Sequence, residues 1–129
     1  MSNKPHYAVE GRDPELKPVV VSFMPNGASD PDSANNRGNA LSSVVLSATG
    51  KWEVTLDDIY PNCIGIHVDI QRATPAAAPV DMGITANTVE TDGKFTINYR
   101  ETNASANIAA NTNTRITATV WVTNRARRG

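Results

Sequence analysis

Apolar and polar side chains alternate between Cys63 and Gln71, which is the strongest structural pattern in this sequence. One face of the segment is aliphatic and the other is small or polar: Ile64, Ile66, Val68 and Ile70 against Gly65, His67, Asp69 and Gln71. Successive side chains of a β-strand point to opposite faces, whereas a helix would distribute these residues around its surface. The pattern therefore predicts a half-buried strand.

Similar patterns predict several more short strands, namely Pro18–Phe23, Ser42–Ala48, Lys51–Leu56, a segment within Val80–Val89, Lys94–Arg100 and Arg115–Thr123. Thr49-Gly50 predicts a hairpin turn between the second and third of these strands. Eight glycines and eight prolines are spread along the chain, which disfavours long helices. Seven or eight short antiparallel strands are typical of an all-β sandwich, either jelly-roll-like or immunoglobulin-like, and the sequence leaves the topology open.

The length of 129 residues indicates one domain with a short extension at each end. Residues 1–17 are polar and interrupted by prolines, so we expect an extended N-terminal arm. Residues 18–124 form the sandwich, and residues 125–129 form a basic tail. Two long irregular loops are predicted, Pro25–Gly38 and Glu101–Thr114, the second with one short turn of helix or a mobile tip.

The composition argues against several classes of function. Twelve basic and thirteen acidic residues are nearly balanced, so no attraction to nucleic acid or to an anionic membrane is expected. The apolar runs are too short to cross a bilayer, and the N-terminus lacks the pattern of a secretory signal. With Cys63 as the single cysteine, the chain has no internal disulfide and no cysteine-based metal cage.

Two groups of residues are candidates for chemical sites. His67 and Asp69 lie two apart on one strand face, where they could touch, but a solvated strand face is the favoured interpretation. The loop oxygens of Asp30, Asp32, Asn35 and Asn36 suit calcium, but their spacing does not match a known calcium loop. An Asx-rich turn is favoured there. We therefore predict no catalytic residue, no metal and no cofactor.

Trp121 is out of phase with the core residues of its predicted strand. The alternation places it on the outer face with Thr117, Thr119 and Thr123. An exposed indole indicates a contact with another subunit or partner. A second buried layer, or a bulge that turns the side chain inward, is an equally open alternative.

Several turn and strand motifs resemble those of small structural proteins of tailed bacteriophages. The similar segments are Met24-Pro25-Asn26-Gly27, Asn36-Arg37-Gly38, Val44–Leu56, Asp58-Ile59-Tyr60-Pro61 and Ala106–Ile116. The resemblance covers about residues 20–125, and proteins of this kind resemble capsid decoration, or cement, proteins. It implies a small β-sandwich, often trimeric, on the outer surface of the head, and it carries over no catalytic residue.

The function expected from this resemblance is non-enzymatic: a homotrimeric virion protein that binds the major capsid protein and stabilises the shell after synthesis in the host cytoplasm. Arm residues are expected to contact the capsid and strand residues to form the subunit interface: Tyr7, Val9, Arg12 and Leu16 in the arm, with Trp121, Thr119 and Thr117 at the interface. The alternative is a receptor- or carbohydrate-binding sandwich on a tail or fibre, with its site in loops 25–38 and 101–114. Neither loop contains an aromatic residue, which disfavours that alternative.

Overall fold

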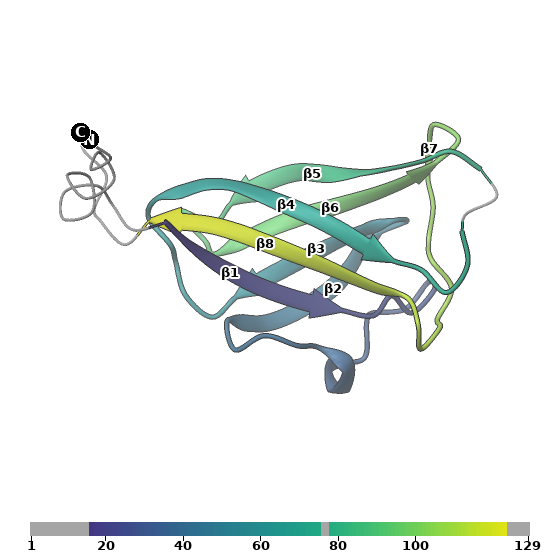
Figure 1. Cartoon of the computed structure of the whole chain (residues 1–129), viewed down its shortest axis with the longest axis horizontal. Coiled ribbons are helices and arrows are strands. Elements are labelled where there is room, and N and C mark those ends of the chain that lie inside the picture. The colour runs from purple at the N-terminus through teal and green to yellow at the C-terminus, as the bar shows by residue number, and fades with distance from the viewer. Residues whose placement is uncertain (1–15, 76–77, 124–129) are drawn as a thin grey trace, which may run out of the picture.

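The chain folds into two antiparallel sheets that face each other in the computed structural model, which describes residues 16–75 and 78–123 (Figure 1). The strands are β1 (Leu16–Phe23), β2 (Leu41–Ala48), β3 (Lys51–Leu56), β4 (Cys63–Gln71), β5 (Val80–Thr88), β6 (Lys94–Glu101), β7 (Ala104–Ser105) and β8 (Arg115–Thr123). One sheet has the order β1-β8-β4, and the other has the order β2-β3-β6-β5 with β7 paired to β6. The predicted all-β sandwich is confirmed. The first and last strands are neighbours, a pairing that the sequence left open.

The core lies between the sheets and is built from alternate positions of the strands. Its buried strand residues are Val21 and Phe23 of β1, Val44 of β2, Trp52, Val54 and Leu56 of β3, Phe95, Ile97 and Tyr99 of β6, and Ile116, Ala118, Val120 and Val122 of β8. The largest of these side chains pack tightly: the rings of Phe23 and Trp52 lie 5.8 Å apart between centroids. Period-two alternation therefore identifies the inward faces of β3, β6 and β8 correctly.

Strand β4 has the predicted bounds, but its first aliphatic residue does not face the core. Cys63 lies opposite Val122 and Gly65 lies opposite Trp121, so Ile64 is the extra residue of a bulge. The prediction that Ile64 shares the inner face is wrong, because the bulge leaves 67% of its surface exposed. The alternation resumes after the bulge, with the remaining aliphatic residues half-buried at this sheet edge: Ile66, Val68 and Ile70.

The β2–β3 hairpin forms at the predicted turn, and Gly50 is its critical residue. Its φ is +68°, a conformation that suits glycine. A Cβ at this position would lie 2.5 Å from the carbonyl oxygen of Ala106. The Gly50 amide donates to Asn107 Oδ1 at 2.8 Å, while its carbonyl accepts from the Tyr99 amide. The turn thus packs directly against the segment that leads into β8.

Some strand boundaries and one loop differ from the sequence-based prediction: β2 begins at Leu41 rather than Ser42, and β6 ends at Glu101 rather than Arg100. Strand β1 begins at Leu16 rather than Pro18, because Leu16 pairs with Thr123 and extends the sheet by two residues. The predicted loop Glu101–Thr114 contains the short strand β7 rather than a turn of helix, and the helical turn η1 (Ser33–Asn35) lies in the other long loop. Residues 1–15 and 124–129 lie outside the described residues, and with them most of the predicted arm and all of the basic tail.

Candidate functional site

Strand β8 is the central strand of the three-stranded sheet (Figure 1). Its residue Trp121 lies between the buried Val120 and Val122, which places the indole on the outer face of the sheet. It is flanked by Pro18 of β1 and Gly65 of β4, and 36% of its surface is exposed. The outward position predicted from the alternation is confirmed. The open alternative of an inward-turning bulge does not apply to Trp121, because the bulge of this pair lies in β4.

Other apolar side chains surround Trp121 on the same face. Leu16 and Val20 lie two residues to either side of Pro18, which makes them diagonal neighbours of the indole. Leu16 is 54% exposed and Val20 is 47% exposed. Ile64, the extra residue of the β4 bulge, is a further exposed apolar side chain. We call this surface, which consists of Leu16, Pro18, Val20, Ile64 and Trp121, the Trp121 patch. Exposed apolar residues gathered in this way mark interaction sites more often than isolated ones do.

Toward the other end of the sheet, the same face becomes polar. Thr117 donates its hydroxyl to Ser22 Oγ at 3.3 Å, and Arg115 Nη1 donates to the same oxygen at 3.0 Å. Partial burial and the positive charge of Arg37 lower the pKa of Arg115. Of the three predicted interface residues, Trp121 belongs to the apolar patch, Thr119 borders it opposite Val20, and Thr117 belongs to this polar network.

The two candidate chemical sites in the sequence consist of residues that have structural roles or lie on the surface. His67 and Asp69 are exposed on the outer face of β4. Asp30 Oδ1 accepts the Leu46 amide at 2.8 Å, and Asp32 Oδ1 caps η1 by accepting the Ala34 amide at 3.0 Å. The favoured Asx-turn interpretation of that loop is thus confirmed. Within residues 16–75 and 78–123, no group of three or more His, Cys, Asp or Glu side chains could hold a metal ion.

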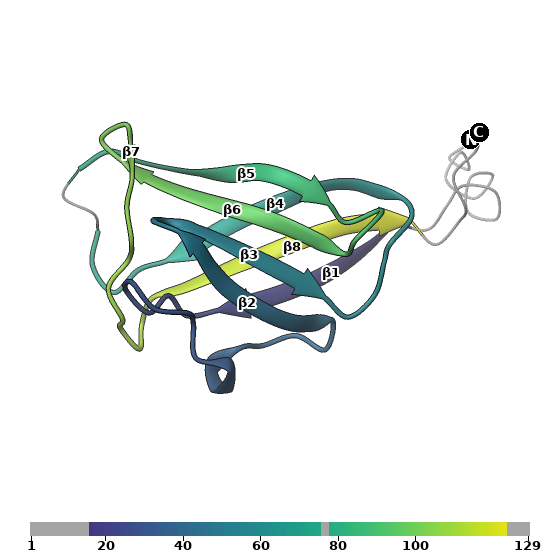
Figure 2. The same cartoon turned by 180° about the vertical axis from the view of Figure 1, so that it is seen from behind.

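Of the predicted capsid-contact residues, the structure places only Leu16. Its position beside Thr123 makes it the first residue of the sheet and a member of the Trp121 patch. Tyr7, Val9 and Arg12 lie outside the described residues. The chain therefore enters the sandwich at the edge of the patch, and it leaves β8 at the same end (Figure 2).

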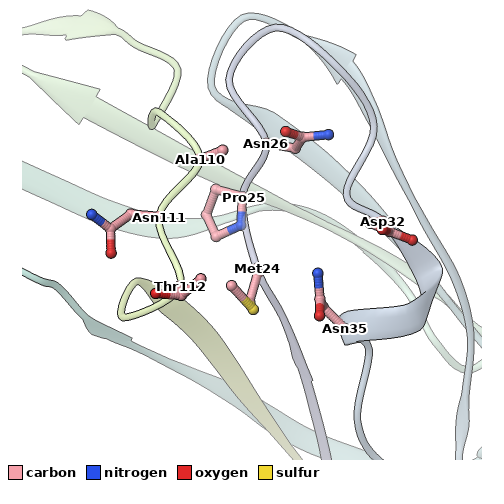
Figure 3. A pocket seen from close by; sticks show the side chains of 8 residues that line it. All are labelled: Met24, Pro25, Asn26, Asp32, Asn35, Ala110, Asn111 and Thr112. Atoms are coloured by element: carbon pink, nitrogen blue, oxygen red, sulfur yellow. The ribbon is translucent and has the colours of Figure 1, made fainter.

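A second surface feature lies at the opposite end of the sandwich, between the two long loops (Figure 3). It is an open pocket of about 290 Å³ whose walls come from both loops: Met24, Pro25, Asn26, Asp32 and Asn35 on one side, and Ala110, Asn111 and Thr112 on the other. The Gly27 amide joins the loops by donating to the carbonyl oxygen of Ile108 at 2.8 Å. We call this feature the loop pocket. The sequence predicted both loops without indicating that they meet in this way.

Comparisons with protein-family models, curated proteins and solved structures find no match to this chain. In the part of the chain that the structure describes, no helix has the length and apolar character needed to cross a membrane.

Proposed function

We propose that this chain is a non-enzymatic decoration protein that binds the outer surface of a tailed-bacteriophage head as a homotrimer and stabilises the shell. The observation that supports this proposal best is the Trp121 patch, an exposed apolar surface on an otherwise well-packed sandwich. The proposal also draws on the motifs that resemble decoration proteins. In it, the partners are the major capsid protein and further copies of the chain.

The patch suits self-association because it is built on a rigid sheet. Trp121 is held in a strand that pairs on both sides, with β1 and with β4, so its backbone is already ordered before any contact forms. Burying preorganised apolar side chains loses little conformational entropy. Around a threefold axis, each copy would present its patch to a neighbouring copy, and the same contact would repeat until the ring closes.

The position of Leu16 connects the trimer contact to the capsid contact. Because Leu16 is both the start of β1 and part of the patch, residues 1–15 join the sandwich beside the proposed interface. A trimer would then carry three such segments near its axis. Tyr7, Val9 and Arg12 supply apolar and cationic groups for the shell. Three linked contacts bind much more tightly than one, provided that all can engage together.

The test is co-sedimentation of the purified chain with phage heads that lack it. We expect the full chain to pellet with the heads and a chain lacking residues 1–15 to remain in the supernatant. The deletion stops before Leu16 because Leu16 pairs with Thr123, so the sandwich stays intact. Circular dichroism and a thermal melt check that it does.

A matched full-length variant, with Tyr7, Val9 and Arg12 changed to serine, separates the side chains of the arm from its length. We expect this variant also to lose binding. Undiminished sedimentation of both altered chains would contradict the role of the arm. Failure of the full chain to bind heads at any concentration would contradict the proposed function itself.

A further inference from the structure

The edge strands of the sandwich differ in how their main-chain groups are protected. They are β1 and β4 in one sheet and β2 and β5 in the other. In β1, the Ser22 amide donates to the carbonyl oxygen of Arg37 at 2.9 Å, the Ser22 carbonyl accepts the Arg37 amide at 2.8 Å, and Pro18 has no amide hydrogen. In β2, the Leu46 amide donates to Asp30 Oδ1 at 2.8 Å. These contacts protect β1 and β2 against pairing with another strand, as is usual for natural edge strands.

Strand β4, by contrast, has free main-chain groups along its outer edge, on the side of the molecule away from η1 (Figure 2). The Thr123 amide donates to the carbonyl oxygen of Asn62, so alternate residues of β8 counted back from Thr123 bond to β4. In the register of this pair, His67 and Asp69 bond to β8 through their main chains. Their neighbours in β4 point to the free edge: Ile66, Val68 and Ile70. Among residues 16–75 and 78–123, the amides of these three residues have no hydrogen-bond partner.

The order of residues in β4 matches an antiparallel copy of the same strand. With a twofold axis beside Val68, Val68 lies opposite Val68 and Ile66 lies opposite Ile70 of the second copy. The outward amides and carbonyls then form about six hydrogen bonds, two for each facing pair. On the outer face, His67 of each copy lies opposite Asp69 of the other. We propose that β4 pairs in this way with β4 of a second copy of this chain, so that the two three-stranded sheets become one continuous sheet.

The polar residues of β4 specify this register. His67 and Asp69 are exposed on the outer face, and facing residues at positions without main-chain hydrogen bonds have the closest side chains. An imidazole N–H can donate to a carboxylate whether the ring is neutral or protonated. The smallest shift that keeps the same face inward is two residues, and it places His67 opposite His67 or Asp69 opposite Asp69. Like charges directly opposite each other are unfavourable, so only the register centred on Val68 pairs unlike groups.

The other unprotected edge strand, β5, does not match its own copy. The bond from the Thr102 amide to the carbonyl oxygen of Pro79 determines which residues of β5 face outward. They are Val80, Met82 and Ile84. A twofold axis beside Met82 would place Asp81 opposite Gly83, which offers no complementary side chain. The register of β5 against β6 also shifts after Ile84, which interrupts a regular edge. Self-pairing is therefore assigned to β4.

The contact is weak on its own, because pairing of two edge strands buries less surface than a stable dimer needs. Covering the half-buried aliphatic side chains of β4 adds some apolar contact. We expect a dissociation constant of about 1 mM for the isolated chain. In a closed shell with threefold and twofold axes, neighbouring trimers would meet β4 to β4 at high local concentration. Only this role on a shell rests on the proposed function, because the pairing itself is a property of the isolated chain.

The first experiment follows the backbone amide chemical shifts of the isotope-labelled full chain between about 0.05 and 2 mM. We expect saturable shifts centred on the three outward amides of β4, while the outward amides of β5 stay unchanged. Shifts at the Trp121 patch report the trimer contact, so failure of the trimer and failure of the β4 contact are distinguishable. Absence of saturable shifts in β4 up to about 2 mM, or shifts of the same size in β5, would overturn the proposal.

Charge variants test the register. Asp69→Lys removes the facing carboxylate, and His67→Asp places carboxylates opposite each other. We expect each variant alone to associate about tenfold more weakly than the wild type. An equimolar mixture of the two variants should regain association, because every facing pair in a mixed dimer then has opposite or hydrogen-bonding groups. Asp81→Lys is the matched control, since it makes the same charge change on the exposed outer face of β5 and should leave association unchanged. A mixture no stronger than either variant alone, or equal weakening by Asp81→Lys, would overturn the assignment.

Discussion

Replacing Trp121 by glutamate should disrupt self-association without unfolding the sandwich. An indole side chain presents up to roughly 250 Å², so an exposed fraction of 36% offers about 90 Å² to a neighbouring copy. At about 25 cal/mol per Å², burial of that area contributes about 2 kcal/mol to each contact. Its loss lowers the association constant of each contact by about 30-fold. The carboxylate makes the loss larger, because it would have to leave water without a partner.

The assay is sedimentation velocity over a concentration series, with Val45→Glu as the matched control. Val45 is 38% exposed, close to the value for Trp121, but it belongs to β2 in the other sheet. We expect the wild type and Val45→Glu to form the same oligomer and Trp121→Glu to remain monomeric at concentrations where they associate. Association of Trp121→Glu to the same extent as the wild type, or equal dissociation of both glutamate variants, would rule out Trp121 as the interface residue.

Three further predictions concern stability, each measured by urea unfolding. Burial, together with the hydrogen bond to Glu101, raises the pKa of Tyr99 above its usual value of 10.0, so the folded state favours the neutral phenol. The contribution of Tyr99 to the free energy of unfolding should be fully present below pH 10 and should be lost as the pH rises through the pKa of the folded state. Tyr99→Phe should make this loss with pH smaller. An unchanged pH profile in Tyr99→Phe would contradict the raised pKa of Tyr99. Gly50→Ala should lower the free energy of unfolding by more than about 2 kcal/mol, because residue 50 has a positive φ and its Cβ would overlap the carbonyl oxygen of Ala106. An unchanged free energy of unfolding would contradict this close contact. Trp52→Ala should lower the free energy of unfolding by about 3–5 kcal/mol, because the Trp52 side chain is fully buried in the core. A decrease below about 1 kcal/mol would contradict that packing.

The sequence predicts the strands well where alternation reflects two different environments. In β8, Ile116, Ala118 and Val120 face the core, while Thr119 and Trp121 face outward, so the pattern and the structure agree. The same holds for β3 and β6, which lie inside the other sheet. If the pairing register of such a strand shifted by one residue, all its apolar side chains would turn to the solvent. The alternation in the sequence therefore indicates which side chains face the core.

The remaining features depend on which strands and loops become neighbours. The bulge at Ile64 arises from the register of β4 against β8, and alternation within β4 alone gives no sign of it. The Trp121 patch combines residues of β1, β4 and β8, whose adjacency the sequence left open. The loop pocket likewise depends on the contact between Gly27 and Ile108. Local patterns carry no information about such distant pairings.

Electron cryo-microscopy of intact particles would show whether the chain decorates the head, because the method locates the chain without altering it. We expect density that matches the two-sheet sandwich at symmetry-related positions over the outside of the head, with the Trp121 faces of neighbouring copies in contact. Density for this chain confined to the tail or a fibre, or particles that contain none of it, would contradict our account.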